Sequence, residues 1–507
     1  MGDQPIWYSP CRGMLTQPQL DASLEEPLYR QLYLHFRDEI LSGRLTRGEK
    51  IPPTRELAGQ LGLNRATVAS AYELLENEGL IRGHVGRGSF VDGPAASTSG
   101  PLRWADRLAD PLLAEVPAPS PDGGVGSISF TSSRPADDLF PLDEFRATCA
   151  EVISGPEAAH LLQLGVPQGF EPLRAHLLAE ARRDHLARPG DDIIITSGCQ
   201  QALDLLQRLL TTAGDTVLVE DPIYPGLRNV FLRAGVRVVG VPIGAQGLDL
   251  DSLDRLIGRE RPRLLVVTPN FQNPTGATIP LAAREALLQL TAAVGIPVIE
   301  NDIYGELRYQ GEPLPTLKAL DSTGAVIQIR SFSKIAFPGL RVGWVLGSSI
   351  LIERLAELKQ WTDLHSDQLS QAVLLRFAQS GRLDAHRRRM VEAGRERLRA
   401  VLAACDRYLP AGSDWTRPQG GMNLWVRLPE PLDASDLLVR ALRQKVSFLP
   451  GRYFAVGRPD PGAFRLSFAG LPPDQIDQGL RILGSICEED RVRGRDFRRD
   501  APAPAIV

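Results

Sequence analysis

The segment Ala325-Val-Ile-Gln-Ile-Arg-Ser-Phe-Ser-Lys334 decides the fold of most of the chain, because an apolar run leads directly into a lysine flanked by serines. Such continuous β-branched runs are typical of strands covered on both faces of a sheet. Similar runs recur between stretches with helical periodicity, which predicts an α/β domain. The expected strands are Asp192–Ser197, Thr216–Val219, Val236–Val239, Leu264–Val267, Pro297–Ile299, Ala325–Ile329 and Val342–Leu346.

The remaining sequence divides around this α/β body. Two further strand patterns, Met422–Val426 and Ala463–Phe468, predict a smaller C-terminal α+β lobe. A Pro/Ser/Gly-rich stretch is typical of a linker, because such composition cannot bury a core. We therefore expect an N-terminal extension at 1–24, a small domain at 25–93, a linker at 94–126, the large domain at 127–488 and a disordered tail at 489–507.

Composition narrows the classes of function. A chain of 507 residues is too long for one core, since single cores rarely exceed about 300 residues. The net charge of −4 excludes nucleic-acid binding by bulk attraction, so any DNA contact needs a local basic patch. No apolar run of about 18 residues predicts a membrane span. The histidines and the five cysteines have no metal-ligand spacing, and we expect reduced thiols in a cytoplasmic protein.

The N-terminal domain has the pattern of a helix-turn-helix followed by a hairpin. Residues 28–43 predict an amphipathic helix, with Leu28, Leu32, Phe36 and Ile40 on its apolar stripe. Thr54 and Asn64 are expected to cap the next two helices, which Leu61-Gly-Leu63 joins. The glycines within residues 81–91 predict the hairpin. This order is that of a winged helix.

Charge in this domain is local. Residues 25–93 hold nine Lys/Arg and ten Asp/Glu, whereas residues 43–91 hold seven Lys/Arg against five Asp/Glu. Arg65 and Thr67 begin the third helix, where recognition helices contact bases or phosphates. Arg55 and Arg87 are candidates for phosphate contacts. Composition alone leaves open a three-helix protein-interaction module with solvated arginines.

Five motifs resemble the GntR family of winged-helix regulators. They are Pro27-Leu-Tyr-Arg-Gln31, Ile40-Leu-Ser-Gly-Arg-Leu45, Pro52-Pro-Thr-Arg-Glu-Leu-Ala58, Arg65-Ala-Thr-Val68 and Gly86-Arg-Gly-Ser-Phe-Val91. The resemblance implies binding of operator DNA as a dimer. The residues expected at the DNA are Arg55, Asn64, Arg65, Thr67, Gly86 and Arg87.

Polar motifs lie at or just beyond the ends of the expected strands of the large domain. They are Ser197-Gly-Cys-Gln-Gln201, Asp221-Pro-Ile-Tyr-Pro-Gly226, Thr268-Pro-Asn-Phe-Gln-Asn-Pro-Thr-Gly276, Glu300-Asn-Asp-Ile-Tyr304, Ser331-Phe-Ser-Lys334 and Pro338-Gly-Leu-Arg-Val-Gly343. Open α/β sheets bind ligands at the carboxyl ends of their strands. Each motif alone is weak, since a lone lysine is usually solvated and Asn-Pro-Thr-Gly is often only a turn. Their ordered combination indicates one site.

Pyridoxal phosphate chemistry needs the groups that these motifs supply. Lys334 can form the imine, Asp302 can hold the pyridine nitrogen protonated, and Tyr224 can stack on the ring. Asn273 and Tyr304 can donate to the ring oxygen, whereas serines, Arg341 and a helix N-terminus suit the phosphate. The predicted cofactor ligands are Gly198, Cys199, Gln200, Tyr224, Asn273, Asp302, Tyr304, Ser331, Ser333, Lys334 and Arg341.

This set resembles fold-type I aminotransferases over nearly all of residues 127–488. The resemblance implies that Arg465 binds the substrate carboxylate, and its strand pattern agrees, because Phe464 and Leu466 share the opposite face. One position departs from the family. Relatives usually carry a tyrosine that contacts the phosphate of the partner subunit, and Leu164 in this position has no hydroxyl for that contact.

The fusion as a whole resembles the MocR (GabR-like) branch of the GntR family. The resemblance implies a homodimeric transcription regulator that senses pyridoxal phosphate and an amino compound. The amine would displace Lys334 from its imine, Arg465 would hold a carboxylate, and operator binding would change. Two alternatives remain open: a working aminotransferase with an appended DNA-binding domain, and a dimerisation scaffold without cofactor.

Overall fold

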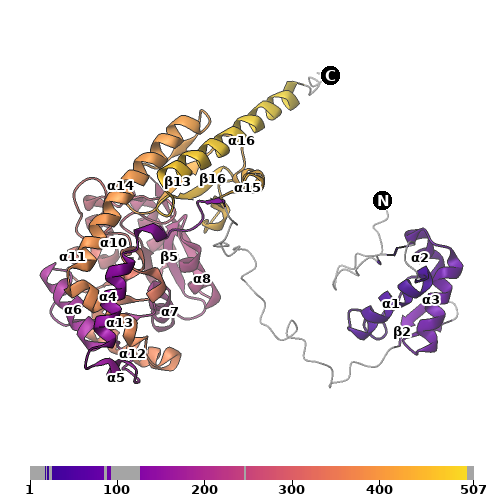
Figure 1. Ribbon diagram of the computed structural model, residues 1–507, viewed down its shortest axis with the longest axis horizontal. Helices are drawn as coiled ribbons and strands as arrows, with labels where there is room; N and C mark the ends of the chain where they lie inside the picture. The colour runs from indigo at the N-terminus through magenta and orange to yellow at the C-terminus, as the bar shows by residue number, and fades with distance from the viewer. Residues whose placement is uncertain are drawn as a thin grey trace. The chain divides into compact units, whose positions relative to one another are not determined.

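The computed structural model describes residues 18, 20–21, 26–84, 88–92, 126–244 and 247–499. The chain forms two compact units, 1–111 and 112–507, which are considered separately (Figure 1). Two of the expected DNA-contacting residues, Gly86 and Arg87, lie outside the described residues. No helix in the described part is both long and apolar enough to cross a membrane.

The N-terminal unit has three helices and a hairpin, as the sequence predicts. Its elements are α1 Leu28–Leu41, α2 Thr54–Leu61, α3 Arg65–Asn77, β1 Ile81–His84 and β2 Gly88–Val91, with the two strands antiparallel. Gly62, at φ 64°, makes the left-handed turn between α2 and α3. Asn64 caps α3 by accepting a hydrogen bond from the amide of Ala66, as expected. The expectation for Thr54 is wrong, because the chain is already helical there and Pro53 is the cap.

The apolar faces of these helices converge on one core. The predicted stripe residues Leu32, Phe36 and Ile40 pack with residues of α2, α3 and the hairpin, among them Leu57 and Tyr72. The Tyr72 hydroxyl donates to the carbonyl of Pro52, which satisfies the one polar atom that this ring carries into the core. The unit therefore has a hydrophobic core of its own.

The C-terminal unit is built on a mixed eight-stranded sheet. In sheet order the strands are β4 Asp191–Thr196, β11 Gly343–Ser348, β10 Val326–Ser331, β9 Val298–Asn301, β8 Leu264–Val267, β5 Thr216–Asp221, β6 Arg237–Gly244 and β7 Gly247–Leu248. The five strands from β10 to β6 are parallel, whereas β11 is antiparallel to both of its neighbours. Strand β4 consequently runs in the same direction as β10.

Successive residues of these strands pack into different cores, as the period of two requires. In β5, Val217 and Val219 join one cluster and Leu218 joins another. Helices α7 Cys199–Leu210, α8 Pro225–Arg233 and α12 Ser349–Asp363 contribute to the first cluster. Helices α9 Leu250–Glu260, α10 Leu281–Ala293 and α11 Leu317–Leu320 contribute to the second. The sheet is therefore covered on both faces, which confirms the α/β prediction.

A smaller sheet follows in the chain, in the order β12 Asp414–Trp415, β13 Asn423–Arg427, β16 Ala463–Ser467 and β15 Leu449–Pro450. Beside it, β14 Val446–Ser447 pairs in parallel with β3 Ile128–Ser129. The long helices α14 Arg382–Tyr408 and α16 Pro473–Arg499 pack together, with α15 Ala434–Arg443 beside α16 (Figure 1). The remaining helices are α4 Leu142–Ile153, α5 Ala158–Leu161, α6 Glu171–Arg183 and α13 Gln368–Gln379.

The expectation of a disordered tail from residue 489 is wrong for residues 489–499, which continue α16. Arginine and glutamate are good helix formers, and this stretch has no proline. The ion pair of Arg440 with Glu489 at 2.6 Å also ties α16 to α15. The charged composition of this stretch is therefore compatible with a helix.

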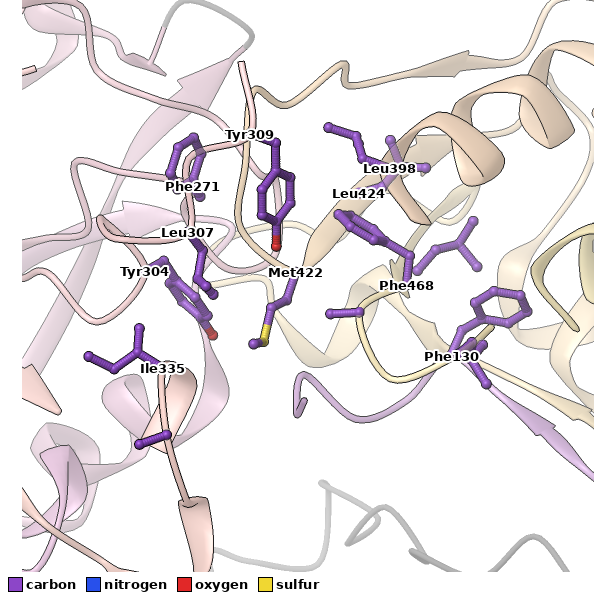
Figure 2. Packing of buried hydrophobic residues seen from close by; sticks show 14 of the residues in the cluster. Phe130, Phe271, Tyr304, Leu307, Tyr309, Ile335, Leu398, Met422, Leu424 and Phe468 are labelled. Carbon is purple, nitrogen blue, oxygen red and sulfur yellow. The ribbon is translucent and has the colours of Figure 1, made fainter. Parts of the chain in front are cut away.

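An apolar cluster connects the two sheets. Figure 2 shows it running from Tyr304 and Ile335, past Met422, to Phe468 and Phe130. Ile335 directly follows Lys334, and Phe130 directly follows β3. The chain entry of the large unit and the lysine motif thus belong to one core.

Candidate functional site

Five strands of the large sheet, β4, β5, β8, β9 and β10, end at one edge because they run in the same direction. The residues that follow them are those that the sequence singles out, from Gly198 after β4 to Lys334 after β10. Parallel strands therefore gather segments that are far apart in the chain.

Lys334 closes the short 3-10 helix Phe332–Lys334 that follows β10. Its Nζ donates a 2.5 Å hydrogen bond to the carbonyl of Ser133 and lies 5.8 Å from the centre of the Tyr304 ring. No carboxylate forms an ion pair with Lys334 within the described residues. Burial therefore lowers the pKa of Lys334 to about 8, with Arg465 and Arg341 acting in the same direction. The neutral, nucleophilic form of this amine is therefore easier to reach near neutral pH than that of an ordinary lysine.

An anion cradle lies beside the lysine, at the N-terminus of α7. Gly198 precedes the helix at φ 82°, and a Cβ there would lie 2.4 Å from a terminal nitrogen of Arg341. Arg341 donates to the Ser333 hydroxyl at 3.3 Å and to the Ser197 carbonyl at 3.4 Å. The Ser331 hydroxyl lies 3.0 Å from that of Ser333. A guanidinium, two hydroxyls and a helix N-terminus together suit a phosphate.

Asp302 follows β9, and its carboxylate is fixed by two arginine-linked contacts. The Asn270 amide donates to Oδ1 of Asp302 at 2.9 Å, and the buried Arg284 donates to the Asn270 side-chain oxygen at 2.6 Å. On the other side, Nε of Arg330 lies 3.9 Å from Oδ2 of Asp302. A carboxylate so placed can hold a ring nitrogen in its protonated form.

The side chains of Tyr304, Asn273 and Arg465 form a chain across the site. The Asn273 amide donates to the Tyr304 hydroxyl at 3.4 Å, and Arg465 donates to the Asn273 side-chain oxygen at 3.0 Å. Burial raises the pKa of Tyr304 to about 12 and lowers the pKa of Arg465 to about 10. Nε of Arg465 has no hydrogen-bond partner among the described residues. This guanidinium therefore keeps a free donor for a carboxylate.

Other predicted ligands lie at the rim. Tyr224 is 43% exposed and its ring lies over Gly226, whose carbonyl accepts a 3.2 Å hydrogen bond from Gln200. Cys199 is the first residue of α7, and its burial raises the pKa of its thiol. Leu164, at the family's tyrosine position, is 76% exposed.

In the N-terminal unit, three of the residues predicted to contact DNA are exposed. Arg55 lies in α2, whereas Asn64 and Arg65 lie at the start of α3. Thr67, one turn into α3, is half-buried. The exposed side chains at the start of α3 fit the position of a recognition helix.

The sequence reasoning missed four residues of the site. Asn270 lies within a motif that was singled out, so its role as the partner of Asp302 could have been found. The carbonyls of Thr131 and Ser133, which accept from Arg465 and Lys334, lie in a stretch without periodicity. Asn423 is fully buried in β13 and accepts from the hydroxyls of Ser133 and Ser467 at 2.6 Å.

Comparison with known proteins places each of the two units in a protein family. Residues 129–483 match the family described as aminotransferase class I and II, and residues 28–91 match bacterial regulatory proteins of the gntR family. The probable rhizopine catabolism regulatory protein MocR of Rhizobium meliloti is 31% identical over 92% of this chain and 95% of its own length. The HTH-type transcriptional regulator TauR of Rhodobacter capsulatus is 30% identical over 93% and 98%. These relatives share the fusion.

Among solved structures, the α-aminoadipate aminotransferase LysN of Thermus thermophilus is 35% identical, with a TM-score of 0.71. The likeness covers 76% of this chain and 99% of LysN, which was solved in complex with N-(5′-phosphopyridoxyl)-L-leucine. The fold-type I aminotransferase fold predicted from the sequence is therefore confirmed.

The cofactor of this unit is pyridoxal phosphate, and the residues present fit it. A Cβ at Gly198 would close the cradle that Arg341 and Ser333 form for a phosphate. Asp302 suits the ring nitrogen, and the Lys334 amine, whose pKa is lowered to about 8, suits the aldehyde. No cluster of potential metal ligands occurs in the described ranges. The chain belongs to the GntR family of transcription regulators, in the MocR-type branch that carries a fused aminotransferase class I and II domain.

Proposed function

We propose that this regulator senses an amino compound bearing a carboxylate, and that occupancy of the site changes its affinity for operator DNA. The observation that carries the proposal is the continuous set of side chains from Lys334 through Tyr304 and Asn273 to Arg465. One end presents the half-buried Lys334 amine, which holds the cofactor aldehyde, and the other the buried Arg465 guanidinium. An amino acid carries an amine that couples to the aldehyde and a carboxylate that pairs with the guanidinium.

Each residue has a defined task in this proposal. Bound pyridoxal phosphate supplies an aldehyde, which couples covalently to an amine, and a ring that accepts electrons. Burial lowers the pKa of Lys334 to about 8, which makes its neutral amine easier to reach, and the amine can take up a proton once displaced. Arg465 orients the effector by its carboxylate, and Asn273 holds Arg465 and the Tyr304 hydroxyl in line. Asp302, fixed by Asn270, keeps the ring nitrogen protonated.

The DNA side of the proposal rests on α3. Its N-terminus presents Arg65 and Asn64 to solvent, and we assign base or phosphate contacts to Arg65 and Thr67 and phosphate contacts to Arg55. Gly86 and Arg87 are assigned to the same interface from the sequence. We further propose that the protein acts as a homodimer, because two recognition helices related by a two-fold axis read two operator half-sites.

The proposal is tested by footprinting the full chain on the DNA upstream of its own gene. The reactions contain the protein alone, with pyridoxal phosphate, and with pyridoxal phosphate plus a panel of amino acids. We expect a protected site whose strength changes with at least one amino acid, and weaker protection by Arg65→Ala than by the exposed control Arg30→Ala. If no DNA site is protected under any of these conditions, the proposal that the protein regulates transcription is contradicted.

One observation also favours catalysis as a second function. The site contains every group that transamination needs, and the lowered pKa of Lys334 suits a general base near neutral pH. Transamination would produce many oxo-acid molecules for each protein molecule. A sensor would instead give at most one equivalent. Measuring oxo acid over several hours with excess amino donor and acceptor distinguishes the two.

A further inference from the structure

The segment 131–134, which we call the strap, lies against both Lys334 and Arg465. The carbonyl oxygen of Ser133 accepts the 2.5 Å hydrogen bond from Lys334, and the carbonyl oxygen of Thr131 accepts one from Arg465. Polar donors removed from water need acceptors, and the strap supplies them from its backbone. One short segment therefore contacts both the lysine that holds the cofactor and the arginine proposed to hold the effector carboxylate.

We propose that the strap is an internal competitor of the effector carboxylate, so that effector binding displaces the Thr131 carbonyl from Arg465. This inference rests on the proposed function, because the effector's carboxylate would use the guanidinium that Thr131 occupies, while its amine couples to the cofactor. A carboxylate makes stronger hydrogen bonds to a guanidinium than a neutral carbonyl does, so the exchange at Arg465 favours the effector. Releasing the strap costs free energy, and this cost lowers the affinity of the protein for the effector.

The Ser133 side chain anchors the strap to the small sheet. The Ser133 hydroxyl donates to the Asn423 side-chain oxygen at 2.6 Å and lies 2.8 Å from the Ser467 hydroxyl. Asn423 and Ser467 are buried cross-strand partners in β13 and β16. This anchor lies on the strand that carries Arg465, so it holds the Thr131 and Ser133 carbonyls in place. Removing it should weaken the competitor without altering the side chain of Lys334 or Arg465.

The strap is also close in sequence to the segment that joins the two units. Only residues 126–130 separate it from residues 93–125, which lead to the DNA-binding unit. The amides of Ile128 and Phe130 donate to the carbonyls of Lys445 and Ser447, and Phe130 is buried near Phe468 (Figure 2). Displacement of the strap would therefore disturb the strand by which the chain enters the large unit. The strap therefore physically connects the effector site to residues 93–125, which lead to the DNA-binding unit.

The matched variants are Ser133→Ala and Ser132→Ala. The Ser132 hydroxyl makes no hydrogen bond within the described part of the chain, so Ser132→Ala controls for the substitution itself. The probe is N-(5′-phosphopyridoxyl)-L-leucine, which joins the cofactor to an amino acid without reacting. We measure its Kd for the apo form of the full chain. Ser133→Ala should bind it about fivefold more tightly than wild type, the effect of one lost hydrogen bond, and Ser132→Ala should match wild type. Equal Kd values for all three proteins overturn the proposal.

A second measurement on the wild-type protein needs no variant. Hydrogen–deuterium exchange of the peptide covering residues 127–135 should become faster when the probe saturates the site, because release of the strap loosens the hydrogen bonds that the amides of Ile128, Phe130 and Thr131 donate. Slower or unchanged exchange overturns the proposal. Operator affinity separates the two ideas: faster exchange with no change in DNA binding would leave the strap established and contradict the sensing function.

Discussion

The two halves of the ligand site are built differently. The half at the edge of the large sheet takes Lys334, Asp302 and Gly198 from the ends of strands, where the sheet itself fixes their positions. The half on the small lobe centres on Arg465, whose acceptors are Asn273, 192 residues away, and Thr131, 334 residues away. The first half is fixed by topology, whereas the second depends on long-range contacts that a ligand can replace. We therefore expect the sheet-edge half to bind the cofactor and the small-lobe half to report on the effector.

The largest expected effect falls on the sheet-edge half. Lys334→Ala removes the amine that attaches the cofactor, so we expect complete loss of pyridoxal phosphate retained through dialysis and of its visible absorbance. Lys445→Ala, at an exposed lysine of the same unit, should behave as wild type. Retention of covalently bound cofactor by Lys334→Ala would show that another residue makes the attachment.

The next variant isolates the small-lobe half. Arg465→Met should weaken binding of N-(5′-phosphopyridoxyl)-L-leucine about 100-fold, because the buried carboxylate loses its charged partner. Binding of pyridoxamine phosphate, which lacks the carboxylate, should change by less than about threefold. The control Arg427→Met removes an arginine that is 62% exposed on the neighbouring strand. Equal losses of affinity for the two probes would contradict the division of the ligand site into two halves.

The pH dependence of cofactor association tests the environment of Lys334. Its pKa is lowered to about 8, so the neutral, reactive amine grows as pH rises through 8 and is lost as pH falls below it. Between pH 8 and pH 6 the neutral fraction falls about 50-fold, and the association rate of pyridoxal phosphate with the apo protein should fall with it. The control is Nα-acetyllysine, whose amine keeps its ordinary pKa. A midpoint above 10 for the protein would contradict burial of the amine.

The smallest effect concerns the support of Asp302. Asn270→Ala removes the amide that donates to Asp302 and the oxygen that accepts from Arg284, both buried. We expect about a tenfold loss of affinity for pyridoxal phosphate by equilibrium dialysis, since a misplaced carboxylate no longer holds the ring nitrogen. Asn229→Ala, on α8, serves as the control. Unchanged affinity would show that Arg330 alone positions Asp302.

The same division explains what the sequence could predict. Strand β8 spans Leu264–Val267, as its apolar run predicts, and Asp302 and Lys334 follow strands that could be located by pattern. The role of Arg465 was predicted from the family resemblance, and the strand pattern agrees with it, because Phe464 and Leu466 alternate with Arg465 and pack into the core. Local pattern was sufficient wherever a strand end positions the residue.

Long-range contacts were beyond the reach of pattern. The strap contributes backbone carbonyls, which any residue type carries, so nothing in the sequence marks Thr131 or Ser133. Asn423 lies among apolar neighbours in its strand. Its role is apparent only from its hydrogen bond with Ser467, which is 44 residues away in the sequence. These residues are near the site because two sheets pack together, and that packing has no local sequence signal.

The central claim is that occupancy of this site controls DNA binding. The most direct measurement is the operator affinity of wild type and Arg465→Met by fluorescence anisotropy, each with pyridoxal phosphate alone and with the amino acid identified by footprinting. We predict that the amino acid shifts wild-type affinity and leaves Arg465→Met unchanged, while the two proteins bind the operator equally without it. An equal shift in both proteins would contradict the account.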